Sequence, residues 1–126
     1  MSELTKEKLL EARGLIELGW TQGTPFDPYT EDVDCYCLGG AIAKVLFNDP
    51  YKMYDLDTQY VFKEFAELAD LPIRNYGAEA NGRWDYDLGD PDWTSSVYYF
   101  NDENSKEDVL AAIDKAVSKL DQGSDQ

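Results

Sequence analysis

Apolar side chains recur at helical spacing in four segments of this chain, and the second segment has the clearest pattern. Positions i, i+3, i+4, i+7 and i+8 of that segment form one apolar face: Leu38, Ala41, Ile42, Val45 and Leu46. The sequence Asn-Asp-Pro that follows, ending at Pro50, is typical of a helix stop. The pattern therefore predicts an α-helix that ends near residue 48.

Three further segments give helical patterns with local start or stop signals. Residues 5–18 begin at Thr5, a possible N-cap, and end before Gly19. Residues 58–70 precede Pro72, and the last helix follows Ser105, an N-cap with acidic residues in the first turn. We expect a core built from Leu9, Ile16, Trp20, Leu38, Ile42, Val45, Phe65, Leu68, Val109, Ile113 and Val117.

The remaining segments read as loops. Residues 21–34 contain glycine, two prolines and four carboxylates, and residues 72–94 form a long irregular segment. Residues 96–101 fit either a short strand or one or two helical turns. The predicted fold class is mainly α: about four helices in one compact domain over residues 1–121, a long acidic aromatic loop at 76–95, at most a short strand pair, and a frayed tail at 122–126.

The strong negative charge of the chain is the feature of its composition that bears most on function. The chain has 11 basic and 26 acidic residues and a net charge of -15. Residues 27–102 alone hold 5 basic and 16 acidic residues, a net of -11. Such a surface repels nucleic acid and anionic membranes and attracts basic proteins, although it also serves solubility alone. No apolar stretch is long enough to span a membrane and no signal peptide is evident, so we expect a cytoplasmic protein that binds neither nucleic acid directly nor a membrane.

Two cysteines, Cys35 and Cys37, stand at the start of the second predicted helix. The helix dipole lowers the pKa of a thiol at this place and favours a reactive thiolate. Nucleophilic cysteines are normally activated by a histidine, and this chain has none. We therefore expect no catalytic residue here. Cys37 and the small residues after it are predicted to allow close packing of a partner helix or of a large ring such as Trp20.

The segment "RWDYDLGDPDW", residues 83–93, alternates carboxylates with aromatic side chains. Aromatic residues supply contact area at protein interfaces, and carboxylates around them steer a basic partner. Two carboxylates of the earlier loop extend the same acidic region. The predicted partner-binding residues are Trp84, Asp85, Tyr86, Asp87, Asp90, Asp92, Trp93, Asp32 and Asp34. A loop whose aspartates are merely solvated is the simplest alternative.

Two chemical alternatives also remain. Oxygen ligands at this spacing suit Ca²⁺, but Gly89 is at the fifth position of a possible EF-hand loop instead of the sixth, and Ser96 is at the twelfth position where a bidentate Glu belongs. The second chemical alternative is a small enzyme that uses Cys37 or paired aspartates. We expect no cofactor and no bound metal.

Three short motifs carry a resemblance to a known family. They are Gly19, Trp20, Gln22 and Gly23; Cys37, Gly40 and Ala41; and Phe100, Asn101 and Asp102. In this order the motifs resemble a family of domains of unknown function found in actinobacteria and their phages. The resemblance implies a phage or bacterial accessory protein, located in the host cytoplasm if a phage encodes it. It implies no activity.

Together these observations favour a non-enzymatic, acidic binding protein. We expect it to bind and inhibit a basic host protein that handles nucleic acid or acts in defence. Mimicry of nucleic acid is one form of this hypothesis. A compact domain of this length is roughly 36 Å across, and duplex DNA of that length carries about 20 charges, so the acidic central segment reaches about half that charge. The oligomeric state stays open, and a module of the protein's own oligomer is a further alternative.

Overall fold

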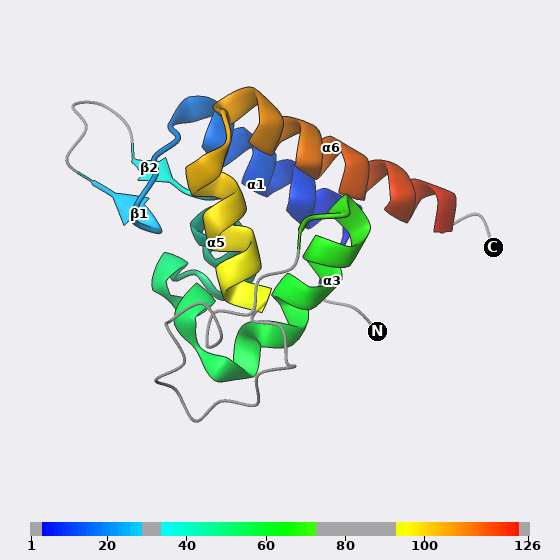
Figure 1. The fold of residues 1–126 in the computed structure, drawn as a ribbon, viewed down its shortest axis with the longest axis horizontal. Helices are drawn as coiled ribbons and strands as arrows, with labels where there is room; N and C mark the ends of the chain where they lie inside the picture. Colours follow the sequence, from blue (N-terminus) through cyan, green and yellow to red (C-terminus); the bar gives the residue numbers. More distant parts are fainter. Residues whose placement is uncertain (1–3, 29–33, 73–92, 124–126) are drawn as a thin grey trace.

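The computed structural model describes residues 4–28, 34–72 and 93–123. In this part of the chain five α-helices pack around one core, with one two-stranded antiparallel sheet (Figure 1). The elements are α1 (Lys6–Leu18), β1 (Phe26–Asp27), β2 (Cys35–Tyr36), α2 (Leu38–Phe47), the 3₁₀ helices η1 (Pro50–Tyr54) and η2 (Leu56–Thr58), α3 (Gln59–Ala69), α5 (Trp93–Glu103) and α6 (Lys106–Gly123). The mainly helical prediction is confirmed, with one more α-helix than the four expected.

Helix α1 begins as predicted and ends for a different physical reason. The Thr5 hydroxyl accepts a hydrogen bond from the backbone N–H of Lys8 at 3.2 Å, which satisfies one of the free donors of the first turn. Gly19 caps the other end in an extended conformation, not the left-handed one that usually selects glycine. A Cβ there would lie 2.7 Å from the carbonyl oxygen of Asp34 and 2.9 Å from Sγ of Cys35. Glycine is therefore needed for close approach of the β2 segment.

Helix α2 ends at Asn48, which adopts the left-handed conformation with φ of 60°. Asp49 then caps η1 by accepting a hydrogen bond from the backbone N–H of Tyr51 at 3.0 Å, and Pro50 occupies the first turn. Helix η1 folds back along α2, so that Met53 contacts Gly39. The sequence predicted the stop of α2 and did not predict the two 3₁₀ helices.

Helix α5 resolves the ambiguity over residues 96–101, because these residues form a helix and not a strand. It also takes in residues 93–95, which the sequence had assigned to the acidic loop. Its buried residues are Thr94, Ser96, Val97 and Asn101, so most of the face that packs against the core is polar. A search for apolar periodicity cannot detect such a face.

Helix α6 begins with a reciprocal cap. The Ser105 hydroxyl accepts from the backbone N–H of Asp108 at 3.1 Å, and the Asp108 carboxylate accepts from the backbone N–H of Ser105 at 3.3 Å. The helix runs through Gly123. Figure 1 shows α6 lying along α1, with α3 on the other side of α5 from the small sheet.

The core lies where α1, α2, α3, α5 and α6 meet. Seven of the eleven predicted core residues are fully buried: Leu9, Ile16, Leu38, Ile42, Phe65, Val109 and Ile113. The other four are partly buried against this core: Trp20, Val45, Leu68 and Val117. Large buried side chains that the prediction omitted include Leu4, Met53, Phe62 and Val97. In the described part of the chain, no helix combines the length and apolar character that crossing a membrane requires.

Candidate functional site

Asn101, near the end of α5, is fully buried at the centre of a hydrogen-bond network. Its Oδ1 accepts from the indole Nε1–H of Trp20 at 2.7 Å and from the backbone N–H of Leu38 at 2.9 Å. Its Nδ2 donates to the carbonyl oxygen of Thr21 at 3.0 Å and to Oδ1 of Asp102 at 3.3 Å. Leu38 is the first residue of α2, so one side chain joins α5, the start of α2 and the segment after α1.

Gln22 closes the C-terminal end of α5 from outside the helix. Its Nε2 donates to the backbone carbonyl oxygens of Asn101, Asp102 and Asn104 at 3.2, 3.1 and 3.1 Å. Carbonyls at a helix end have no partner within the helix, so this amide supplies the cap. The backbone N–H of Gly23 donates to the Asp102 carboxylate at 2.9 Å. The first and third sequence motifs are thus bonded directly to each other.

Cys37 caps the N-terminus of α2 with its sulfur. Its Sγ accepts from the backbone N–H of Gly40 at 3.3 Å and lies 3.9 Å from Sδ of Met53. Burial raises the pKa of this thiol to about 12, and hydrogen bonds from backbone N–H groups oppose the increase only in part. The thiol is therefore protonated at neutral pH. The predicted packing role fits this environment, and the lowered pKa of a nucleophilic cysteine does not.

Of the two neighbours predicted for the small residues after Cys37, a partner helix and the ring of Trp20, the structure places helical segments there: a Cβ at Gly39 would lie 3.6 Å from Val97 of α5. A Cβ at Gly40 would overlap the backbone carbonyl of Pro25, and a Cβ at Gly39 would overlap the side chain of Met53. The close partners of this ridge are therefore the strand segment and η1, not the ring of Trp20. That ring is partly buried on the core and points its N–H at Asn101.

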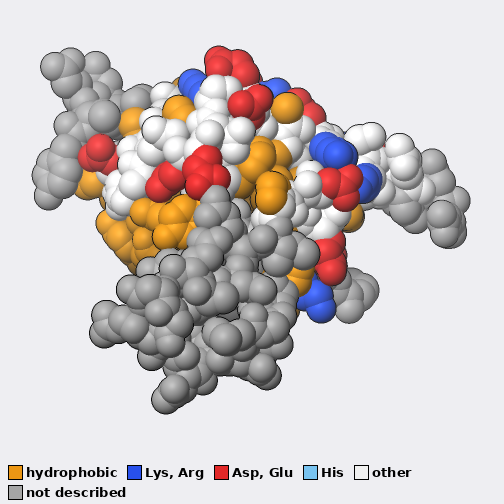
Figure 2. Space-filling model, in the orientation of Figure 1, with side chains coloured by type: hydrophobic (Ala, Val, Ile, Leu, Met, Phe, Trp, Pro, Cys, Tyr) orange, Lys and Arg blue, Asp and Glu red, His pale blue; other side chains and the backbone are white. Residues whose placement is uncertain are grey.

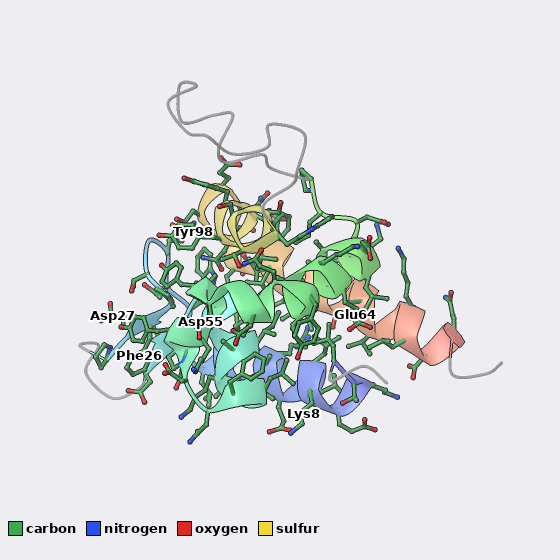
Figure 3. The ribbon with its side chains drawn as sticks, turned by 90° about the horizontal axis from the view of Figure 1, so that it is seen from below. Lys8, Phe26, Asp27, Asp55, Glu64 and Tyr98 are labelled. Carbon is green, nitrogen blue, oxygen red and sulfur yellow. The ribbon has the colours of Figure 1, made fainter. Side chains whose placement is uncertain are left out.

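Three tyrosines gather between η1 and α5, and we call Tyr54, Tyr98 and Tyr99 the tyrosine cluster. The ring centroids of Tyr54 and Tyr98 are 6.4 Å apart, and those of Tyr98 and Tyr99 are 5.6 Å apart in an edge-to-face arrangement. Tyr54 is 53% exposed. Figure 3 shows Tyr98 projecting from α5 on the side of the helix where the small sheet lies. The cluster thus offers aromatic surface to a partner.

The hydroxyls of Tyr54 and Tyr98 stay neutral at physiological pH, because the pKa of each is raised. Burial of its hydroxyl raises the pKa of Tyr54 to about 12, and the neighbouring Tyr98 adds to the increase. Burial and then the charge of Asp102 raise the pKa of Tyr98. Neutral aromatic rings beside a carboxylate attract a cation through the ring face, as arginine side chains do in proteins. Acid–base chemistry near neutral pH is not favoured by these pKa values.

The surface near the tyrosine cluster is acidic, and we call Asp27, Asp34, Asp55 and Asp102 the acidic end. Figure 3 shows Asp27, Asp55 and Tyr98 toward the same end of the molecule. Figure 2 shows acidic side chains beside the large hydrophobic patch below the small sheet, and among the described residues no Lys or Arg side chain borders the patch in that view. One described ion pair of this end joins Asp55 to Lys52 at 3.3 Å.

Basic side chains elsewhere are paired between helices. Arg13 of α1 forms a bidentate pair with Asp114 of α6, at 2.7 and 3.1 Å. Lys115 and Lys119 of α6 both contact Asp70, at 2.8 and 2.9 Å. The positive charge of α1 and α6 is therefore used within the fold.

The predicted partner-binding residues fall mostly outside the described part of the chain. These are Asp32, Trp84, Asp85, Tyr86, Asp87, Asp90 and Asp92. Trp93 opens α5 and is partly buried against the core. Asp34 is exposed directly before β2. The calcium-binding alternative concerned residues 85–92 and lies outside as well.

Sequence reasoning missed the tyrosine cluster. Tyr54 is the last residue of η1, a helix that the sequence did not predict, and Tyr98 belongs to a segment whose helical state was left open. The available signal was the presence of tyrosines at positions that the apolar stripes do not use. Across residues 4–28, 34–72 and 93–123, no group of three His, Cys, Asp or Glu side chains is placed to hold a metal ion.

Comparison with known proteins gives one match. A family model described as "Family of unknown function (DUF6197)" matches residues 1–119, nearly the whole chain. No curated protein and no solved structure matches.

Proposed function

Because the chain belongs to the DUF6197 family of unknown function, we propose its function from its surface: it is a non-catalytic, acidic protein-binding domain whose partner is a basic protein. In its finer form, the proposal is that the partner handles nucleic acid in a bacterial host and is inhibited by the bound domain. The resemblance to proteins of actinobacteria and their phages supports a bacterial or phage accessory protein.

The observation that carries the proposal is the tyrosine cluster within the acidic end. Tyrosine supplies large contact area at little cost in side-chain entropy, and it is enriched among the residues that dominate binding energy. Tyr54 and Tyr98 present their rings where the charge of Asp102 is close enough to raise the pKa of Tyr98. Such a surface suits a cationic side chain, held by ring faces and by nearby carboxylates.

Overall charge supports a partner that binds nucleic acid. Proteins that bind the phosphate backbone carry clustered lysine and arginine, and that same surface is attracted by an acidic protein. The net charge of -15 on 126 residues would speed the encounter and make it dependent on ionic strength. Occupation of the basic surface would then exclude nucleic acid.

A peptide-binding experiment tests the proposal. The probes are an arginine-rich peptide and a lysine-rich peptide of equal length and charge, titrated into the protein by calorimetry at low and high NaCl. We expect both to bind at low salt, the arginine peptide more tightly because guanidinium groups stack on tyrosine rings. Binding should weaken steeply as salt is added.

Matched variants identify the surface. Tyr98→Ala and the charge reversals Asp34→Lys and Asp55→Lys should weaken binding, whereas Glu7→Lys on α1 and Glu107→Lys on α6 should leave it nearly unchanged. Reversal of Asp85, Asp87, Asp90 and Asp92 together should abolish it. If both sets of charge reversals weakened binding equally, net charge alone would explain the binding, and a specific site would be refuted.

A second experiment addresses the finer proposal. A pull-down from bacterial host lysate, washed first at low and then at high salt, should retain a basic protein that elutes with salt. Duplex DNA added to the purified complex should compete with the domain for that protein. If DNA and the domain bind the captured protein simultaneously, inhibition by exclusion of nucleic acid is wrong.

A further inference from the structure

Helix α1 has an exposed apolar stripe on the side away from the core. Leu10 is 44% exposed and Leu18 is 70% exposed, and Gly14 lies midway between them. Residues four apart follow one ridge of a helix surface, so the ridge has a leucine on each side of a central depression. The core face of the same helix is formed by Leu9, Ala12 and Ile16, so this stripe is not needed for the fold.

No contact within the described part of the chain explains why residue 14 is a glycine. Glycine is the poorest helix former after proline, and it persists inside helices where something approaches the backbone closely. Gly19, Gly39 and Gly40 each have such a neighbour. A Cβ at Gly14 would meet no atom within 4 Å. The depression at Gly14 therefore faces open space in the single chain.

This depression continues into a groove between α1 and α2 with a volume of about 410 Å³. Its lining is mostly apolar, with one side chain of each charge: Glu11, Gly14, Leu15, Leu18, Lys44, Val45 and Asn48. Lys44 donates a hydrogen bond to Asn48 at 3.0 Å, and Glu11 is 62% exposed with a single ion pair at 4.0 Å to Lys8. Both charges of the groove are thus available to a partner.

The face formed by α1 and α2 differs in charge from the rest of the molecule. Helix α1 holds three basic and three acidic residues, and the charged side chain of α2 is Lys44. This near-neutral face occurs on a chain of net charge -15. Figure 3 shows Lys8 of α1 at the opposite side of the molecule from Tyr98. A second copy can approach here with far less repulsion than at the acidic end.

We propose that the α1–α2 groove is the interface of a homodimer, in which α1 of one copy crosses α1 of a second copy at Gly14. An antiparallel two-fold arrangement centred on Gly14 places Leu10 of each copy beside Leu18 of the other, because the two leucines are equally distant from the glycine. Identical ridges of residues four apart pack against each other in the commonest class of helix crossing. The proposal includes a contact between Glu11 of one copy and Lys44 of the other, the two opposite charges that line the groove.

Sedimentation velocity from micromolar to near-millimolar protein tests the dimer. We expect concentration-dependent dimerisation that strengthens when NaCl is raised, because salt screens the repulsion between two strongly acidic copies while leaving apolar contact intact. Binding of a basic peptide at the acidic end has the opposite salt dependence, so the two interactions are distinguishable. A monomer at every protein and salt concentration would overturn the proposal.

Variants locate the interface. Gly14→Arg should abolish dimerisation without loss of helix content, and without loss of melting temperature at concentrations where the wild type is monomeric, because the single chain has room for the side chain. Ser118→Arg, at an exposed position of α6, adds the same group and should leave the dimer intact. A wild-type dimer that persists in Gly14→Arg would place the interface elsewhere and refute this geometry.

A charge exchange tests the two-fold pairing. Glu11→Lys alone and Lys44→Glu alone should each weaken dimerisation by about tenfold, and the double variant should recover most of the loss because each copy then presents the exchanged pair. Equal, additive losses in the double variant would contradict the predicted contact.

Discussion

Replacing Asn101 by alanine should destabilise the protein severely, because the side chain satisfies several groups that cannot otherwise find partners. Asn101 has no exposed surface. Truncation leaves the backbone N–H of Leu38, the indole N–H of Trp20 and the carbonyl of Thr21 without their present partners. The bond to Leu38 is the most serious loss, because that N–H is buried at the first turn of α2.

The magnitude follows from these groups. A buried polar group left unsatisfied costs about 1 to 3 kcal/mol. Counting the N–H of Leu38 in full and the partly buried groups of Trp20 and Thr21 at the low end gives a loss of about 3 to 5 kcal/mol. Domains of this size have a free energy of unfolding of roughly 5 to 15 kcal/mol, so the variant should be near the limit of folding.

Urea denaturation followed by tryptophan fluorescence provides the measurement. The slope of the free energy of unfolding against urea should stay unchanged if the native state keeps its compactness. Asn104→Ala is a matched control, since Asn104 lies just beyond the same helix and its side-chain amide donates to the carbonyl of Phe100 at 2.9 Å. That variant should lose about 1 kcal/mol.

Trp20→Phe isolates one bond of the network, because it removes the indole N–H and keeps an aromatic ring. Combined with Asn101→Ala in a double-mutant cycle, it should cost less than the sum of the single changes, since both remove the same hydrogen bond. A loss below about 1 kcal/mol for Asn101→Ala would refute the reasoning, because it would mean that water or relaxation satisfies all three groups.

Three further predictions follow from single residues. Cys37 should react with thiol reagents at neutral pH only at the rate of unfolding, because it is buried and its pKa is raised to about 12; fast labelling of the folded protein would contradict this. Asp70→Asn should flatten the loss of stability in acid, measured by urea denaturation at several pH values. Lysine ammonium groups lower the pKa of Asp70 from 3.8 to about 2, so its contribution is present above the unfolded value and lost as the pH falls toward the folded one. Gly14→Ala should raise the free energy of unfolding of the monomer by up to about 1 kcal/mol, whereas Gly40→Ala, which overlaps the carbonyl of Pro25, should lower it, and thermal melts of this pair check both signs.

The helix ends predicted from sequence depend on local chemistry, which explains why those predictions succeeded. Thr5 and Ser105 bond to N–H groups three residues away. The stop after α2 needs only Asn48 in a left-handed conformation before a proline segment. Groups so close along the chain form the same hydrogen bonds whatever the rest of the fold, so the sequence alone predicts these helix ends.

Helix α5 and the candidate site depend instead on contacts between distant segments. The buried face of α5 is polar because Asn101 is satisfied by Trp20, which is 81 positions away in the sequence. Tyr98 meets Tyr54 only because η1 folds back along α2. No periodicity within either segment indicates these contacts, so the sequence alone could not separate helix from strand at residues 96–101 or bring the tyrosines together.

The polar side chains of the three short sequence motifs are also those with the least freedom to bind anything else. The side-chain amide of Gln22 donates to backbone carbonyls, both polar atoms of the Asn101 side chain are occupied, and the thiol of Cys37 caps a helix. A partner that used these groups would have to break the fold. Recognition must therefore depend on side chains that the fold leaves exposed, and Tyr54 in the acidic end and Leu18 beside the α1–α2 groove are large apolar groups of this kind. The two proposed interactions should respond to salt in opposite directions, so one titration with NaCl should separate them.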